Sequence, residues 1–131
     1  MSRLIPSSTV GRRWAAVIAA AQPYRREGVD PMALWRIVER RLQTVRLDGP
    51  IVYLAIGHQI AQYVGQTHDT MQVRLNKHMC SEAKAQNWSH MACITLDLKT
   101  PALVVNDLET TAREIMKPLM GSRTPRRRET G

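Results

Sequence analysis

The sequence predicts an α+β protein: a small antiparallel three-stranded sheet flanked by helices, in the order strand, strand, helix, strand, helix, preceded by an N-terminal two-helix extension. Three observations predict it. Apolar residues recur at helical spacing before residue 49, short apolar runs follow Pro50, and helical spacing returns near the C-terminus. The chain has 131 residues, 44% of them hydrophobic and 23% charged. This suffices for one packed domain with a modest core and excludes two large domains.

Residues 1–49 are expected to form a basic pair of helices. Apolar residues of the first helix recur at intervals of three and four, at Val10, Trp14, Val17, Ile18 and Ala21. Asp30 followed by Pro31 is typical of the start of a second helix. The apolar positions of this second helix are Leu34, Trp35, Val38, Leu42 and Val45. Gly49 and Pro50 would end it.

Three apolar runs after Pro50 predict strands. Residues 51–56 and 60–64 are two such runs, and the Gly57-His58-Gln59 segment between them is typical of a β-hairpin turn. A third run, residues 92–96, is expected to pair beside the hairpin.

Two helices are expected around the third strand. Asp69 can cap a helix that runs to about Glu82. Asn106, with Glu109 three residues later, has the spacing of a capping box and predicts the start of the last helix. Residues 50–121 therefore form the predicted second unit, and residues 122–131 a basic C-terminal tail.

The positive charge lies at the two ends of the chain. Residues 1–49 carry a net +5, residues 50–116 a net −1 and residues 117–131 a net +4, within a total of +8. Basic flanks around a neutral body favour binding to a polyanion through counterion release, with an acidic protein or an anionic lipid surface as alternatives. The side chains expected to contact nucleic acid are Arg36, Arg40, Arg41, Lys77, Arg126, Arg127 and Arg128.

Membrane insertion and a disulfide framework are not expected. The longest apolar stretch covers eight residues, 14–21, against the roughly 18 to 20 that span a bilayer. Cys80 and Cys93 are too few for a disulfide scaffold and suit a reducing cytoplasm. The protein is expected in the cytoplasm of a bacterial or phage-infected cell, associated with the nucleoid. Together with His78 and His90 they could in principle hold Zn²⁺, although this spacing is not a usual zinc pattern.

Four short segments follow one another in a recognisable order. They are Ile51-Val52-Tyr53, Tyr63-Val64-Gly65-Gln66-Thr67, Arg74-Leu75-Asn76-Lys77-His78, and Leu108-Glu109 near the start of a late helix. In order, in spacing and in the elements that carry them, they resemble the GIY-YIG nuclease domain. The resemblance covers residues 50 to about 121.

The resemblance implies catalytic roles for five residues. Glu109 would hold a divalent metal, Mg²⁺ or Mn²⁺, and Arg74 would clamp the scissile phosphate with its planar guanidinium. His78 lies four residues after Arg74 and therefore on the same helical face. Tyr53 is expected to act as the base on the attacking water, with Tyr63 and His78 as orienting or proton-relay partners. A free phenol has a pKa near 10, so neighbouring groups must favour its ionised form.

The chain departs from the family pattern at three places. Ile51-Val52-Tyr53 lacks the leading glycine, and Gln66 stands where some members carry lysine. Pro118 is followed three residues later by Gly121 instead of asparagine, so that contact is missing or comes from Ser122.

The sequence thus predicts a metal-dependent DNA endonuclease, a phosphodiester hydrolase of phage, mobile-element (homing) or restriction type. A structure-specific repair nuclease and a non-cutting nucleic-acid-binding or assembly subunit with the same fold are the alternatives, and an RNA substrate stays open. DNA is the expected partner. A protein could bind through the N-terminal helices, or the chain could form a homodimer.

Overall fold

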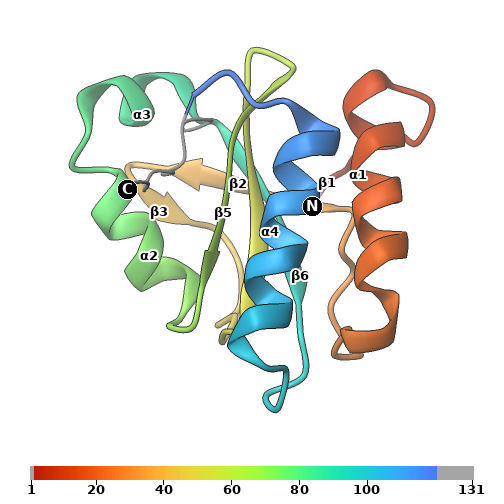
Figure 1. Ribbon diagram of the computed structural model, residues 1–131. Coiled ribbons are helices and arrows are strands. Elements are labelled where there is room, and N and C mark those ends of the chain that lie inside the picture. Colours follow the sequence, from red (N-terminus) through yellow and green to blue (C-terminus); the bar gives the residue numbers. More distant parts are fainter. Residues whose placement is uncertain (1, 121–131) are drawn as a thin grey trace, which may run out of the picture.

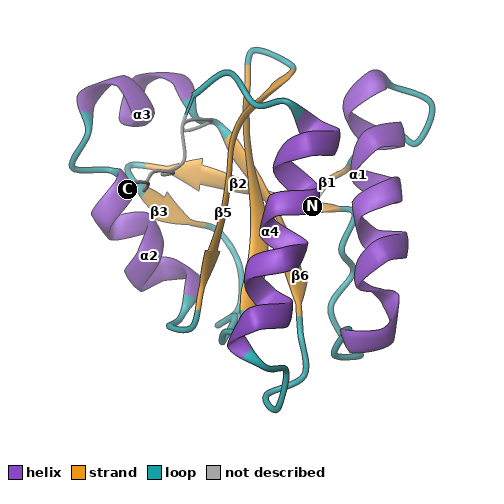
Figure 2. Ribbon diagram, viewed as in Figure 1, coloured by secondary structure: helices purple, strands orange, loops and turns teal. Residues whose placement is uncertain are grey.

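The computed structural model describes residues 2–120 and places one sheet between two layers of helices (Figures 1 and 2). Within these residues the protein is an α+β fold with six antiparallel strands, ordered β1-β2-β6-β4-β5, and β3 pairs with β2. The strands are β1 (Ser2–Arg3), β2 (Ala33–Val38), β3 (Arg41–Leu42), β4 (Ile51–Gly57), β5 (Ile60–Thr67) and β6 (His90–Thr95). The helices are α1 (Thr9–Ala21), α2 (Met71–His78), α3 (Glu82–Asn87) and α4 (Ala102–Met116), with a 3₁₀ turn at Gln22–Tyr24.

The expected three-stranded sheet and N-terminal helix pair are wrong. Within residues 2–49, α1 is the one α-helix, followed by the 3₁₀ turn, and the predicted second helix is the hairpin of β2 and β3. Leu34 packs toward α1 and α4 while Trp35 packs on the opposite side, which is the alternation of a strand. Asp30 caps no helix: it accepts a hydrogen bond from the Met32 amide and pairs with Arg3. The expected two-helix docking surface is therefore absent from the described residues.

Two tight turns shape the sheet. The hairpin expected over residues 51–64 is present as β4 and β5, with His58 and Gln59 at positive φ (55° and 67°) between the paired Gly57 and Ile60. Glu39 and Arg40 have φ of 51° and 66° and join β2 to β3 in the same way. Two consecutive residues at positive φ are typical of a type I′ turn, which suits the twist of a β-hairpin.

The helix expected over residues 69–82 is divided into two. Thr70 caps α2 through its side chain, α2 ends at His78, and Ser81 caps α3. The bend between them turns α3 back over the residues at the end of α2. Helix α4 begins four residues before Asn106, with Pro101 at its N-cap, so the expected capping box is wrong and Glu109 lies inside the helix.

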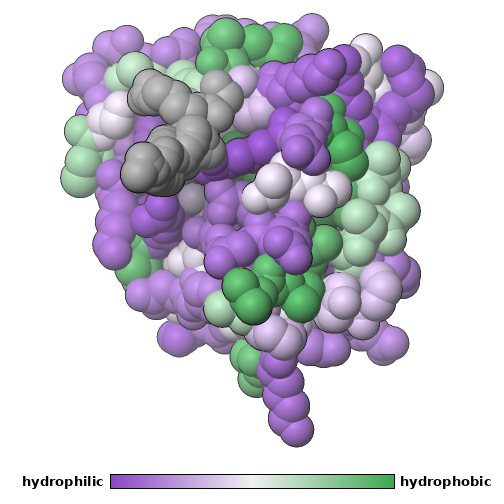
Figure 3. All heavy atoms as spheres, in the orientation of Figure 1, coloured by the Kyte–Doolittle hydropathy of each residue, from purple (hydrophilic) through white to green (hydrophobic). Residues whose placement is uncertain are grey.

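The two faces of the sheet bury separate clusters. The cluster under α1 and α4 includes Trp14, Leu54 and Leu108, and the cluster under α2 and α3 includes Tyr53 and Leu75. The face in Figure 3 is mostly hydrophilic, and its apolar residues form small separate patches. None of the helices described within residues 2–120 has the length and apolarity needed to cross a lipid bilayer.

Candidate active site

The Tyr53 hydroxyl is held by two nitrogen groups from one helix. Its Oη lies 2.7 Å from Nε2 of His78 and accepts a hydrogen bond from Nε of Arg74 at 3.2 Å. Arg74 and His78 are one turn apart on α2, and Tyr53 is on β4 below them. The structure therefore brings three of the five sequence-predicted catalytic residues into direct contact.

Gly65 makes room for the Tyr53 ring. It lies opposite Tyr53 in the β4–β5 ladder. A Cβ atom at this position would lie 2.5 Å from the Tyr53 Oη and 2.7 Å from its Cζ. These separations are well inside van der Waals contact, so only glycine allows the phenol to pass over β5 toward the outer edge of the sheet.

Gly65→Ala is accordingly expected to destabilise the protein by about 1–3 kcal/mol, because the phenol and the new methyl group cannot share this space. Urea denaturation measures the effect. The matched control is the same substitution in a Tyr53→Ala background, in which the penalty should become smaller but not vanish, because Cε2 of Tyr63 lies 2.8 Å from the same Cβ position. Equal penalties in the two backgrounds would show that the glycine serves something other than the phenol.

Tyr63 packs into an aromatic cluster around His78. Its ring centroid lies 6.2 Å from that of Tyr53, 4.8 Å from that of His78 and 5.4 Å from that of Trp88. The ring centroid of Trp88, which follows the last residue of α3, also lies 4.9 Å from that of His78. These contacts fix the plane of the imidazole, and burial of His78 and Trp88 keeps water away from it.

Burial and two nearby cations keep His78 neutral. Burial is the main cause that lowers the pKa of His78 to about 3, and the charges of Lys84 and Arg74 act in the same direction. Burial raises the pKa of the Tyr53 phenol above its usual value, while the hydrogen bond and charge of Arg74 oppose this rise. Near neutral pH the site therefore holds an uncharged imidazole against a protonated phenol, and the phenolate forms only where donors such as Arg74 offset the effect of burial.

Glu109 approaches the same edge of the sheet from α4. Its Oε1 accepts a hydrogen bond from Nε2 of Gln66 on β5 at 2.8 Å, and its Oε2 pairs with Arg113 at 2.6 Å. Gln66 also donates to Asn106. The Arg113 guanidinium lies 5.8 Å from the Tyr63 ring centroid and so connects the carboxylate to the aromatic cluster. Glu109 is thus a partner of β5 and not a capping residue.

The Glu109 carboxylate fits a single-carboxylate magnesium site. Each of its oxygens accepts one hydrogen bond and has a second lone pair, and the side chain is 16% exposed. Mg²⁺ is usually held by one or two carboxylates, several waters and a substrate phosphate.

The His and Cys side chains that could in principle hold Zn²⁺ do not gather into a metal site. Among residues 2–120 no group of three or more His, Cys, Asp or Glu side chains is arranged to hold a metal ion. Cys80 is exposed while Cys93 is buried in β6, and burial raises the pKa of Cys93 to about 12. His78 is committed to Tyr53.

Three of the basic residues expected to contact nucleic acid lie close to the site helix. Arg41 is exposed on β3, which packs beside α2, and Lys77 is exposed on α2 itself. Arg40 donates to the Met79 carbonyl at 3.0 Å and pairs with Glu82, so it also ties the β2–β3 hairpin to the segment between α2 and α3.

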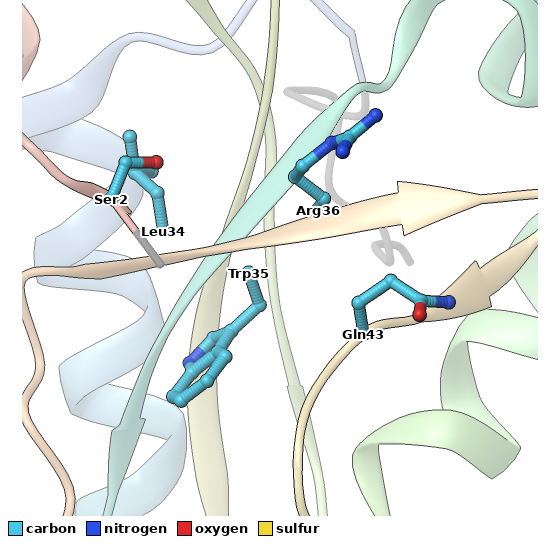
Figure 4. A pocket seen from close by; sticks show the side chains of 5 residues that line it. All are labelled: Ser2, Leu34, Trp35, Arg36 and Gln43. Atoms are coloured by element: carbon cyan, nitrogen blue, oxygen red, sulfur yellow. The ribbon is translucent and has the colours of Figure 1, made fainter.

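Arg36 is separated from this group. It lies on β2 and points away from Trp35, which packs on the α2 and α3 side (Figure 4). It lines a shallow pocket with Ser2, Leu34, Trp35 and Gln43. Arg126, Arg127 and Arg128, with the rest of the expected tail and the Ser122 position, lie outside the described residues.

Sequence reasoning missed Lys84 and Arg113. Lys84 Nζ lies 2.9 Å from Nδ1 of His78, and Arg113 pairs with Glu109. The i,i+4 spacing of Glu109 and Arg113 on a helix was a usable signal. Lys84 reaches the site only because α3 folds back, and no spacing along the chain indicates that contact.

Comparison of the chain with known protein families, curated proteins and solved structures gives no match. The case for a function therefore depends on the residues and their geometry.

Proposed function

We propose that this protein is a metal-dependent endonuclease of the GIY-YIG type that hydrolyses phosphodiester bonds in DNA. The observation that carries the proposal is the Tyr53 hydroxyl lying between Nε2 of His78 and Nε of Arg74. Tyr63 packs against the same imidazole, and Glu109 stands at the same sheet edge, linked to Tyr63 through Arg113. Tyr53, Tyr63, Arg74 and His78 thus form one contact group, and Glu109 is connected to it through Arg113.

In this proposal Tyr53 is the base. Its oxygen takes the proton from the attacking water, and N–H donors around that oxygen stabilise the phenolate form. Arg74 donates Nε to Tyr53, and its terminal nitrogens would donate to the non-bridging oxygens of a phosphate. The same guanidinium would then stabilise both the phenolate and the negative charge that grows on the phosphorus centre.

Glu109 is the residue that would hold Mg²⁺ or Mn²⁺. Bound there, the ion would supply a positive charge to offset the charge that develops on the phosphate during hydrolysis. Arg113 and Gln66 orient the carboxylate from either side.

The charge distribution supports DNA as the substrate. Arg41 and Lys77 are exposed beside α2, and Arg40 lies at the adjoining turn. Cations placed along one flank of a site gain affinity for a phosphate backbone through counterion release. We propose, as the sequence predicted, that the protein acts in the cytoplasm as a nuclease of phage, mobile-element or restriction type.

A plasmid-nicking assay tests the proposal. Supercoiled plasmid incubated with the protein and Mg²⁺ or Mn²⁺ is expected to give open-circular or linear DNA, and excess chelator should stop the reaction. A gel shift in chelator should show that binding is retained. Cleavage of an RNA strand of the same sequence is measured in parallel.

The proposed endonuclease activity would be contradicted if the protein bound DNA but cut none of the plasmid, branched and single-stranded substrates with either metal. That result would favour the non-cutting binding subunit. Cleavage of branched DNA alone would identify a structure-specific repair nuclease.

A further inference from the structure

His78 has a second partner that the catalytic motif does not include. Nζ of Lys84 lies 2.9 Å from Nδ1 of the imidazole, on the side opposite the Nε2 that meets Tyr53. Both ring nitrogens of His78 are therefore engaged, one by a lysine from α3 and one by the phenol on β4. The three side chains form a chain from Lys84 through His78 to Tyr53.

Aromatic faces hold the Lys84 amine in place. Nζ lies 4.8 Å from the centroid of the Tyr63 ring and 5.6 Å from that of Trp88. A cation over an aromatic face is attracted to the π system, more strongly where water is excluded. Ser81, which caps α3 and accepts a hydrogen bond from the Lys84 amide, fixes the backbone from which this side chain extends. The amine is thus oriented toward Nδ1.

The chemistry of an ammonium group determines where the imidazole proton lies. Burial and the charge of Arg74 lower the pKa of Lys84. While this amine stays an ammonium group it donates hydrogen bonds and accepts none, so Nδ1 beside it is the bare acceptor nitrogen. A neutral imidazole carries one N–H, which then lies on Nε2 and points at the Tyr53 oxygen. Arg74 Nε donates to the same oxygen. In this arrangement the Tyr53 oxygen accepts two hydrogen bonds, which favour its negatively charged form.

We infer that Lys84 is a positioning residue that fixes His78 as the Nε2–H tautomer, so that His78 donates to Tyr53 and supports the phenolate as the base. This inference rests on the proposed nuclease function. The proton balance has two steps: the phenol first gives its own proton to bulk water, and the proton of the attacking water then goes to the Tyr53 oxygen. His78 keeps its proton on Nε2 throughout.

The tautomer is measured directly by ¹⁵N NMR of the full chain with labelled histidine. Long-range proton–nitrogen couplings identify which ring nitrogen carries hydrogen, and the His78→Gln variant assigns the His78 signals. The wild type is expected to show Nδ1 without hydrogen and Nε2 with it. Hydrogen on Nδ1 would overturn the inference, because Lys84 would then be the acceptor and Tyr53 the donor.

Variants of Lys84 give the second readout. Lys84→Met should lose the preference for Nε2–H and lower the cleavage rate by about 10- to 100-fold, the usual effect of removing a group that orients an active-site histidine. Lys84→Arg should keep the tautomer, because a guanidinium also only donates. Lys99→Met removes the same charge at an exposed loop position and should change neither measurement.

The two proposals fail separately. The expected tautomer in a protein that cuts no nucleic acid would refute the nuclease and leave the role of Lys84 intact. Active Lys84→Met protein with an unchanged tautomer would refute the role of Lys84 and leave the nuclease intact. If Lys84→Met does not fold, the wild-type spectrum and Lys84→Arg still decide the question.

Discussion

Arg74→Lys is expected to reduce DNA cleavage by about a thousandfold or more, the scale on which a phosphate-binding arginine acts in phosphoryl transfer. The guanidinium donates Nε to Tyr53 at 3.2 Å, and its terminal nitrogens would bind the phosphate. Lysine has one ammonium on a flexible stem, so it cannot hold the phenol oxygen and a phosphate at once in a fixed plane. Single-turnover cleavage of plasmid at saturating protein measures the chemical step apart from binding.

The matched control for this charge-conserving change is Arg13→Lys, at an exposed position of α1. It should leave the single-turnover rate within about twofold, as expected for a surface position. If an Arg74→Lys protein folds normally and cuts at the wild-type rate, the guanidinium is not required for cleavage.

Glu109→Gln is expected to abolish metal-dependent cleavage while DNA binding persists. A bound metal ion contributes several kcal/mol to transition-state stabilisation, which corresponds to a loss of about a thousandfold. The amide also places a donor where Gln66 and Arg113 already donate, so one of those contacts must break. Nicking over a range of Mg²⁺ concentrations and gel shifts in chelator measure the two properties separately.

Glu114→Gln provides the comparison, since it removes the same charge from an exposed position of the same helix. Thermal unfolding of both variants shows whether the loss of the Arg113 pair alters the fold. Full activity of Glu109→Gln at ordinary Mg²⁺ concentrations would mean that this carboxylate is not the metal ligand.

The elements that the sequence predicted well are those whose pattern permits a single interpretation. The runs on either side of His58-Gln59 are too short for helices and lie close together, and the structure has β4 and β5 there. The motif residues Tyr53, Arg74 and His78 depend on this hairpin and on the helix that follows it, so their contact was within reach of sequence reasoning.

The hairpin of β2 and β3 was missed because its turn carries no glycine, asparagine or aspartate. Glu39 and Arg40 adopt the positive φ values that those residues usually supply. Leu34, Trp35, Val38 and Leu42 match a helical stripe, yet Leu34 and Trp35 pack on opposite faces of β2, Val38 is exposed at the end of that strand, and Leu42 lies on β3. Pairing with β6 over Trp35 and Arg36 decides between the two, and that partner is more than fifty residues away in sequence.

The division of the helix after His78 was missed for a local reason. Ser81 is a good N-cap, but the residues on either side continue the helical pattern. The bend is what brings Lys84 and Trp88 to His78. Part of the site therefore depends on a backbone change that residue spacing does not reveal.

The position of β5 as the last strand of the sheet has a mechanical consequence. Tyr53, Arg74 and His78 belong to the layer on one face and Glu109 belongs to the helix on the other. The link between them runs around β5 through Arg113, which pairs with Glu109 and lies beside the ring of Tyr63. A small slide of α4 along the sheet would change the separation of guanidinium and carboxylate while each layer kept its own packing. Activity is consequently expected to be lost at lower denaturant concentrations than secondary structure, because the reacting groups lie in two layers and their separation depends on how α4 is placed against the sheet.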